Sequence, residues 1–227
     1  EAIEITIGDN FSMNIRMVDC VGYTVEGASG YEDEEGPRMV STPWFDYDIP
    51  FQEAAELGTR KVITDHSTIG IVVTTDGTIA DIPRENYREA EQRVINELKE
   101  LGKPFVVLIN STHPGAEEVC SLQDELTMVY DVPVISLNCL ELSQGDLSLI
   151  LEEVLYEFPV RDVAVQLAPW VEILEKGHWL KSNYEESIAE NVPAVSRVRE
   201  VSGLLEKFKE YAFIEDAILS RIDLGKG

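Results

Sequence analysis

Positively charged residues are scarce in this chain of 227 residues, in which 18 Lys and Arg stand against 43 Asp and Glu and give a formal net charge of −25. Nucleic-acid binding needs clustered basic side chains to neutralise phosphates, and anionic membrane surfaces attract basic segments. The composition therefore argues against a nucleic-acid partner and against binding to a membrane surface. The charge alone names no partner, because a high net charge also serves solubility.

Long apolar runs are also missing. The strongest run, Phe105–Ile109, has the length of a β-strand and falls far short of the ~20 residues of a transmembrane helix. No basic N-terminus leads into an apolar segment, so the sequence predicts neither a signal peptide nor a transmembrane segment. A hydrophobic share of 44% is nevertheless enough to form a globular core.

Cysteine and histidine are too few and too scattered to suggest a metal site. The three cysteines, Cys20, Cys120 and Cys139, lack CxxC spacing and predict three buried thiols in a reducing cytoplasm. The three histidines have no partner at zinc-ligand spacing. The acidic run Glu32–Glu35 lacks the alternating oxygen ligands of a calcium loop, which favours a solvated loop.

Apolar segments of strand and helix period alternate along the first 158 residues. The pattern predicts strands over 2–7, 12–18, 68–74, 105–109 and 132–137, and helices over 51–64, 84–101, 116–129 and 147–155. The turn signal Gly8–Asn10 makes the first two strands antiparallel, and a long loop covers 22–50. Near-continuous apolar strands separated by helices predict an α/β fold, with a mostly parallel sheet covered by helices on both faces. Residues 159–227 look α-rich and are expected to form a second region.

Ligands of such sheets bind beyond the carboxyl ends of the strands, and the strongest motif there is MNIRMVDCVG. It places Asp19 at the end of a predicted strand and Gly22 three positions later. In P-loop NTPases an acid in this place holds Mg²⁺, usually through water, and the glycine N–H approaches the γ-phosphate. Taken alone, the motif is more typical of a strand-end Asp that caps a turn.

A second group of candidates follows the later strands. At the end of the strand that contains Val107–Asn110, a GTPase would read NKxD, where this chain reads Asn110-Ser111-Thr112-His113. Because the Lys and the guanine-reading Asp are absent, the sequence favours adenine or no base preference. Ser136 begins the segment that corresponds to the last base-side loop, and Thr74–Gly77 lies at another strand end facing the same site. Asn110, Ser111 and Ser136 are therefore the candidate nucleotide-binding residues.

Three long runs carry a family resemblance: RMVDCVGYTVEGASGYEDEEGPRMVSTPW, STIGIVVTTDGTIADIPRENYREAEQRVINELKELGKPF and VLYEFPV. They resemble the stage IV sporulation protein A family, the spore-coat morphogenetic ATPases of endospore-forming bacteria. The resemblance implies a GTPase-like P-loop NTPase domain over 1–158, followed by the start of an α-rich middle domain over 159–227. It also implies ATP and Mg²⁺ as cofactors, Asp19 as the Mg²⁺-side acid, and Gly22 as the switch glycine.

The same resemblance implies a cellular role. Hydrolysis of ATP would be coupled to self-assembly into the basement layer of the spore coat, in the mother-cell cytoplasm at the forespore surface. The implied partners are copies of the protein itself and other coat and membrane-anchoring morphogenetic proteins.

One expected motif is absent, the phosphate-binding loop GxxxxGK[ST]. Gly102-Lys103-Pro104 precedes a strand and lacks both the upstream glycine and the following Ser or Thr. We therefore expect a fragment without the first strand, the P-loop, the first helix and the C-terminal segment, whose own nucleotide binding is incomplete. Two alternatives stand beside this prediction. The chain could serve as a non-catalytic assembly module, whereas a receiver-like signalling domain would need a second acidic pair and a strand-end Lys that are not evident.

Overall fold

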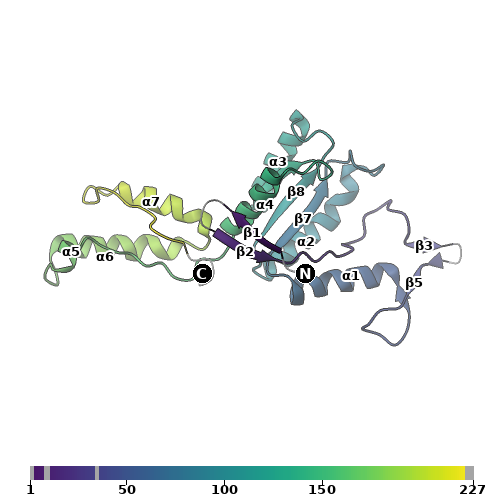
Figure 1. Cartoon of the computed structure of the whole chain (residues 1–227), viewed down its shortest axis with the longest axis horizontal. Coiled ribbons are helices and arrows are strands. Elements are labelled where there is room, and N and C mark those ends of the chain that lie inside the picture. Colours follow the sequence, from purple (N-terminus) through teal and green to yellow (C-terminus); the bar gives the residue numbers. More distant parts are fainter. Residues whose placement is uncertain (1–2, 8–10, 34–35, 223–227) are drawn as a thin grey trace. The chain divides into compact units, whose positions relative to one another are not determined.

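The structure is a computed structural model that describes residues 3–7, 11–33 and 36–222 (Figure 1). The chain divides into two compact units, residues 1–154 and 155–227, and the division falls within helix α4 (Gln144–Tyr156). The turn predicted at Gly8–Asn10 and the acidic residues Glu34 and Glu35 lie outside the described residues.

A parallel sheet forms the centre of the first unit. Its strands are β7 (Gly70–Thr75), β8 (Phe105–Asn110) and β9 (Val134–Leu137), in the order β7-β8-β9. Helices α2 (Arg88–Glu100) and α3 (Glu117–Tyr130) connect the strands, and Figure 1 shows β7 and β8 side by side. Apolar side chains from these elements form one core, which includes Val72, Ile95, Leu98, Phe105, Val107, Ile109, Val119, Leu126 and Val134. The predicted α/β architecture with a parallel sheet is thus confirmed.

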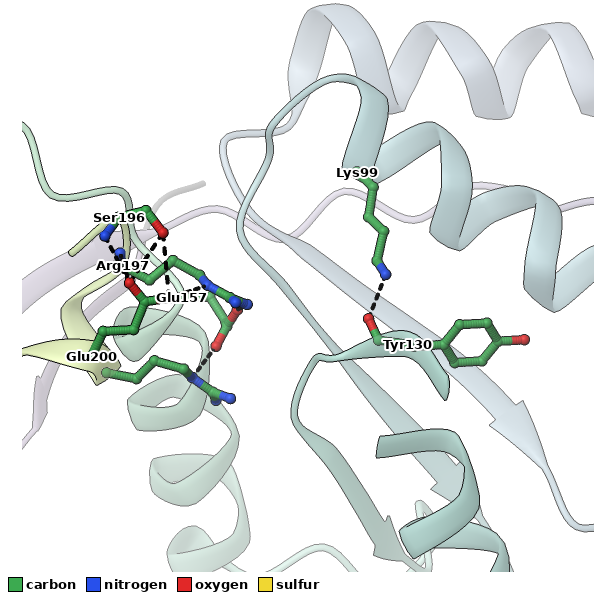
Figure 2. Close-up of polar contacts among 7 residues, drawn as sticks. Lys99, Tyr130, Glu157, Ser196, Arg197 and Glu200 are labelled. Carbon is green, nitrogen blue, oxygen red and sulfur yellow. Dashed lines mark hydrogen bonds and ion pairs between the residues drawn. The ribbon is translucent and has the colours of Figure 1, made fainter. Parts of the chain in front are cut away.

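Two lysines, at and just after the C-terminal end of α2, bind backbone carbonyls at the ends of other helical segments. Helix α1 (Phe51–Lys61) continues into the π-helical turn η1 (Val62–His66), and the 3-10 turn η2 (Arg84–Tyr87) precedes α2. The Lys103 ammonium donates to the carbonyl oxygens of Ile63 at 2.6 Å, Thr64 at 2.9 Å and Ser67 at 2.6 Å. Lys99 donates likewise to the carbonyl of Tyr130 at the end of α3 (Figure 2). Lys103 therefore caps orphan helix carbonyls.

The N-terminal hairpin is shorter than predicted. Strands β1 (Ile3–Ile7) and β2 (Phe11–Ile15) pair antiparallel, with Ile3 opposite Ile15. The prediction of a strand over 12–18 that ends at Asp19 is wrong, because the described ladder stops at this pair and the residues after Ile15 have no described partner strand. Met17 and Val18 are consequently exposed.

The long loop after Gly22 contains two short antiparallel ladders. One pairs β3 (Glu32–Asp33) with β4 (Gly36–Pro37), and the other pairs β5 (Met39–Val40) with β6 (Ile49–Pro50). The second ladder brings the chain to the start of α1, where the Phe51 N–H donates to the carbonyl of Arg38 at 2.7 Å.

The prediction of three buried thiols is wrong. Cys20 and Cys120 are exposed and Cys139 is half-buried. Cys20 lies in the segment that follows β2 without a partner strand. Cys120 lies on the outward face of α3, since the buried residues of that helix include its neighbour Val119.

Strand β7 is less covered than the sequence predicted. Val72 and Thr74 are buried on one of its faces, whereas Ile71 is 39% and Val73 57% exposed on the other. Within the described residues, no strand pairs with the outer edge of β7, because the sheet order places it at the end. Helical cover on both faces is therefore complete over β8, whose residues 105–109 are all buried, but not over β7.

The second unit is mainly helical, as predicted. It contains α5 (Pro169–Glu172), α6 (Trp179–Asn191), the 3-10 turns η3 (Val192–Ala194) and η4 (Val198–Glu200), and α7 (Val201–Lys209). A groove of about 710 Å³ lies between α6, α7 and the extended segments 158–168 and 214–222. None of the helices in the described ranges combines the length and apolarity needed to cross a membrane.

A charged cluster holds the start of the second unit to its later segment. The buried carboxylate of Glu157 pairs with Arg197 at 3.1 Å (Figure 2). It also pairs with Arg199. Beside it, the Val160 N–H donates to the Ser196 carbonyl at 2.9 Å and the Val198 N–H donates to the Phe158 carbonyl at 3.0 Å. The ion pairs and the strand-like backbone pairing act on the same two segments.

Candidate functional site

The carboxyl ends of the three parallel strands meet at one edge of the sheet. The register places Thr75 of β7 opposite Asn110 of β8, and Asn110 opposite Leu137 of β9. The loops that follow the strands therefore begin at the same level. In open α/β sheets this edge is the usual place for a ligand.

Asn110 and Ser111 are brought together at this edge. The Asn110 side-chain oxygen accepts a hydrogen bond from the Cys139 N–H at 2.9 Å, which joins the end of β8 to the loop after β9. The Ser111 N–H donates to the Leu137 carbonyl at 3.0 Å, and its side chain is fully buried. Both residues thus help to fix the backbone of the base-side loops.

Ser136 lies on the neighbouring strand but is turned toward α3. Its hydroxyl donates to the Gln123 side-chain oxygen at 2.7 Å and lies 3.1 Å from the Pro114 carbonyl oxygen. The Ser136 N–H also reaches Gln123, at 3.2 Å. In this structure the Ser136 side chain therefore joins β9 to α3 by a hydrogen bond.

Asp76, which follows β7, is the central acceptor of the site. The sequence placed its segment, Thr74–Gly77, at a strand end facing the site but did not single out Asp76 as a binding residue. Its carboxylate accepts from the Ser111 hydroxyl at 2.7 Å, the Thr78 hydroxyl at 2.7 Å and the Thr78 N–H at 3.0 Å. We call Asp76, Thr78, Asn110 and Ser111 the strand-end cluster. The signal that could have found Asp76 is an Asp-Gly pair directly after a buried strand, since such a turn aims a carboxylate across the sheet edge.

The electrostatics of Asp76 favour the ionised carboxylate. Burial by itself would raise its pKa, but hydrogen bonds from Ser111, Thr78 and Thr75 outweigh burial and hold the pKa below its ordinary value. A carboxylate that accepts several hydrogen bonds keeps its charge and orients its donors.

A buried ion pair lies beneath the cluster. The Arg84 guanidinium contacts the Glu91 carboxylate at 2.7 Å and donates to the Thr74 hydroxyl at 3.3 Å. Glu91 also accepts from the Tyr130 hydroxyl at 3.1 Å. This buried network connects the carboxyl end of β7 to α2 and α3 and so stabilises the strand end at which the cluster lies.

The structure places Asp19 and Gly22 apart from these contacts. Asp19 is exposed, and it makes no hydrogen bond or ion pair with any residue that the structure describes. Gly22, with φ +85°, bonds through its N–H to the Thr59 hydroxyl of α1 at 3.0 Å. Among the described residues, no hydrogen bond joins Asp19 or Gly22 to Asn110, Ser111 or Ser136.

The residue after Gly22 anchors the following loop. The Tyr23 hydroxyl donates to the Glu97 carboxylate of α2, and the Arg93 guanidinium lies 4.1 Å from the centre of the Tyr23 ring. Arg93 also pairs with Glu56 of α1 at 2.9 Å. A pocket of about 250 Å³ opens beside this group, lined by both helices and the loop.

No ready-made metal centre exists in the described part of the chain, where no three His, Cys, Asp or Glu side chains come together in a metal-binding group. Mg²⁺ in nucleotide sites is held by one or two carboxylates together with substrate phosphates. The solvent-facing carboxylate of Asp19 fits such a partial role, since no described side chain competes for it.

Comparison with known proteins gives one consistent result. Residues 1–159 match the family described as "Stage IV sporulation protein A, ATPase domain", and residues 160–227 match "Stage IV sporulation protein A, middle domain". The chain is 52% identical over 227 residues to stage IV sporulation protein A of Bacillus subtilis (strain 168), and 51% identical to that of Bacillus anthracis. It is 45% identical to that of Clostridioides difficile (strain 630).

Each of these matches covers 100% of the chain and 46% of the relative, so the chain spans about half the length of the curated relatives. No solved structure matches the chain.

Proposed function

Because the chain belongs to the stage IV sporulation protein A family, we propose that it forms the larger part of an ATPase domain whose hydrolysis of ATP drives self-assembly into the basement layer of the spore coat. Membership of the family gives the chain a role in sporulation. The observation that carries the ATPase part of the proposal is the match of residues 1–159 to the ATPase domain of that family.

Within this proposal the phosphate side belongs to the segment after β2. Asp19 would hold Mg²⁺, which when bound neutralises charge on the phosphates. The Gly22 N–H would bond to the terminal phosphate. Its positive φ suits that role, because glycine lets a backbone donor approach a ligand closely.

The base side belongs to the strand-end cluster. Asn110 and Ser111 would hold the base-side loops in place from the end of β8, and Ser136 would support them through its contacts with α3. His113 stands where a guanine-specific site carries an acid. With no carboxylate there to accept from the two donors of guanine, we expect adenine to be preferred.

The open edge of β7 supports the addition of a further strand and helix. A parallel strand can pair with that edge, and a helix after it can cover Ile71 and Val73, which are 39% and 57% exposed. A strand followed by a helix is the unit that carries a phosphate-binding loop in P-loop NTPases. We propose that such a unit completes the nucleotide site of the full-length protein.

We further propose that the protein acts in the mother-cell cytoplasm at the forespore surface. Its partners there would be other copies of itself and the coat and membrane-anchoring morphogenetic proteins.

A second candidate function is a non-catalytic assembly module. It is favoured by one observation, that the 227 residues contain no GxxxxGK[ST] loop. In that case the chain would supply surfaces to the polymer while phosphate binding took place elsewhere.

The test compares ATP binding and Mg²⁺-dependent hydrolysis by the full-length protein with those of this chain. We expect hydrolysis by the full-length protein, a preference for ATP over GTP, and at least about tenfold loss in Asp19→Ala. A matched control is Asp33→Ala, which removes an exposed acid from β3 of the same unit. Wild-type turnover and assembly in Asp19→Ala would contradict the site, and the absence of ATP hydrolysis by the full-length protein would favour the assembly module.

A further inference from the structure

Asp76 forms a link between two strand ends that are distant in sequence. Its bonds to Thr78 close a local turn of the kind that many Asp residues make. Its bond to Ser111, at 2.7 Å, instead crosses from the loop after β7 to the loop after β8, 35 positions along the chain. A turn does not require this second bond, so it calls for another explanation.

Ser111 connects Asp76 to the backbone of the loop that follows β8 through two hydrogen bonds. The Ser111 hydroxyl donates to Asp76 and accepts from the His113 N–H at 3.0 Å. Because the hydroxyl has a single hydrogen, the carboxylate fixes where that hydrogen points and leaves a lone pair for the backbone of His113. The direction of the Ser111 hydroxyl hydrogen thereby determines the backbone conformation of residues 111–113.

A parallel link runs beside the first. The Thr112 N–H donates to the Thr78 hydroxyl at 3.0 Å, and this hydroxyl in turn donates to Asp76 at 2.7 Å. Two successive residues of the base-side loop, Ser111 and Thr112, are therefore oriented through the same carboxylate. Thr112 and His113 are exposed at the sheet edge, so the loop presents an open surface on a fixed frame.

We propose that Asp76 is the positioning residue of the base-side loop 111–113, and that it determines how tightly the enzyme holds an adenine nucleotide without contacting the phosphates. This inference rests on the proposed ATPase function and deepens it. It assigns the base specificity of the site to the hydrogen bonds from Asp76 and Thr78 that hold the loop in place. The loop itself has no carboxylate that could read the base.

The substitution Asp76→Asn tests these hydrogen bonds with little change in the shape of the side chain. The oxygen of the new amide can still accept from Thr78, but its NH₂ group is a donor and cannot accept the Ser111 proton. The Ser111 hydroxyl can then accept from that NH₂ group as well as from the His113 N–H, but its own hydrogen loses the carboxylate acceptor that fixed its direction. The matched control is Asp131→Asn, the same exchange at the exposed left-handed cap of α3, where φ is 50° and Asn is well tolerated.

Steady-state kinetics of the full-length protein should separate the two substitutions. In Asp76→Asn we expect KM for ATP to rise about tenfold, the size of one charge-assisted hydrogen bond, while kcat changes less than about twofold. The ratio of ATP to GTP use should fall, and Asp131→Asn should match the wild type in all three quantities. Ser111→Ala removes the same link from its other end, so it should reproduce the rise in KM, and the double variant should be no worse than either single one.

Each outcome decides the inference. Wild-type KM in both Asp76→Asn and Ser111→Ala, or a loss confined to kcat, would overturn it. If Asp76→Asn does not fold, as judged by circular dichroism, Ser111→Ala alone decides, because it keeps the Asp76 turn intact. If the wild-type full-length protein itself does not hydrolyse ATP, the proposed function fails first, and that result is distinct from a failure of Asp76.

Discussion

The backbone N–H of Gly22 donates a 3.0 Å hydrogen bond to the hydroxyl oxygen of Thr59, and the same hydroxyl donates back to the Gly22 carbonyl at 3.3 Å. Both polar groups of one peptide residue are thus held by one buried side chain of α1, which is 2% exposed. The donor that we assign to a phosphate is engaged within the protein. Nucleotide binding would then exchange the Thr59 partner for a phosphate oxygen and release the loop after Gly22 from α1.

We expect Thr59→Val to loosen this attachment. Valine fills the same volume without a hydroxyl, so the variant should lose about 1–2 kcal/mol of unfolding free energy. The Gly22 amide should also exchange its hydrogen faster, which native-state hydrogen exchange can measure. Thr59→Ser keeps the hydroxyl and should retain the protection of Gly22. Unchanged protection in Thr59→Val would mean that other contacts hold the segment.

Gly22→Ala is expected to destabilise the first unit through its backbone alone. The glycine has φ +85°, and no atom lies within 4 Å of the position that an added Cβ would occupy. The cost should be about 1–2 kcal/mol, the penalty of a left-handed conformation for an L-residue. Gly115→Ala, in equally open space without a positive φ, should stay within about 0.5 kcal/mol of the wild type in urea unfolding. Equal effects of the two substitutions would exclude the backbone explanation.

Glu157→Gln should weaken the second unit. Its carboxylate is 4% exposed and serves two arginines, so neutralising it leaves both guanidinium groups without their buried counter-charge. We expect a loss of about 3 kcal/mol, together with faster amide exchange at Val160 and Val198.

The control for this prediction is Glu206→Gln. That residue pairs with Lys209 at 3.0 Å on the surface of α7, where an ion pair contributes less than about 1 kcal/mol. A similar small loss in both variants would show that the Glu157 cluster is replaceable by neutral hydrogen bonds.

Stability of the first unit should fall at alkaline pH because of Tyr130. Burial, followed by the Glu91 carboxylate, raises the pKa of Tyr130 from 10.0 to about 12. The folded state therefore favours the neutral phenol, and this contribution is fully present below pH 10 and is lost as the pH rises toward 12. Tyr130→Phe should make the fall in unfolding free energy over this pH range smaller; part of the fall should remain, because burial also raises the pKa of Tyr23 in the same unit. Tyr47→Phe, which removes an exposed phenol, should keep the wild-type profile.

The periodic parts of the fold could be predicted from the sequence because burial imposes them. Phe105–Ile109 is apolar at every position, as expected of a strand covered on both faces, and it is buried throughout. The spacing of apolar residues over 84–101 likewise predicted α2, whose buried positions include Ile95 and Leu98. The position of Asn110 and Ser111 at the carboxyl end of this strand could be predicted, because Asn110 ends β8 and Ser111 follows it directly.

Features that depend on a partner segment could not be predicted in this way. Strand β2 ends at Ile15, so the apolar residues Met17 and Val18 did not extend it to Asp19. The role of Asp76 depends on Ser111, 35 positions later, and no local pattern contains that contact. The exposure of Cys20 has the same origin as the displacement of Asp19, since both lie in the segment beyond the β1–β2 ladder.

Strand β7 has the composition of an interior strand at the position of an edge strand. Its sequence, GIVVTT, contains no proline and no charged residue that would discourage pairing with a foreign strand. A six-residue segment with high β-propensity and no charge is the type that nucleates intermolecular sheets when it is left open. Preparations of this chain should therefore need low protein concentration to remain monomeric, and a segment that pairs with β7 would act in cis as the protein's own protection against aggregation.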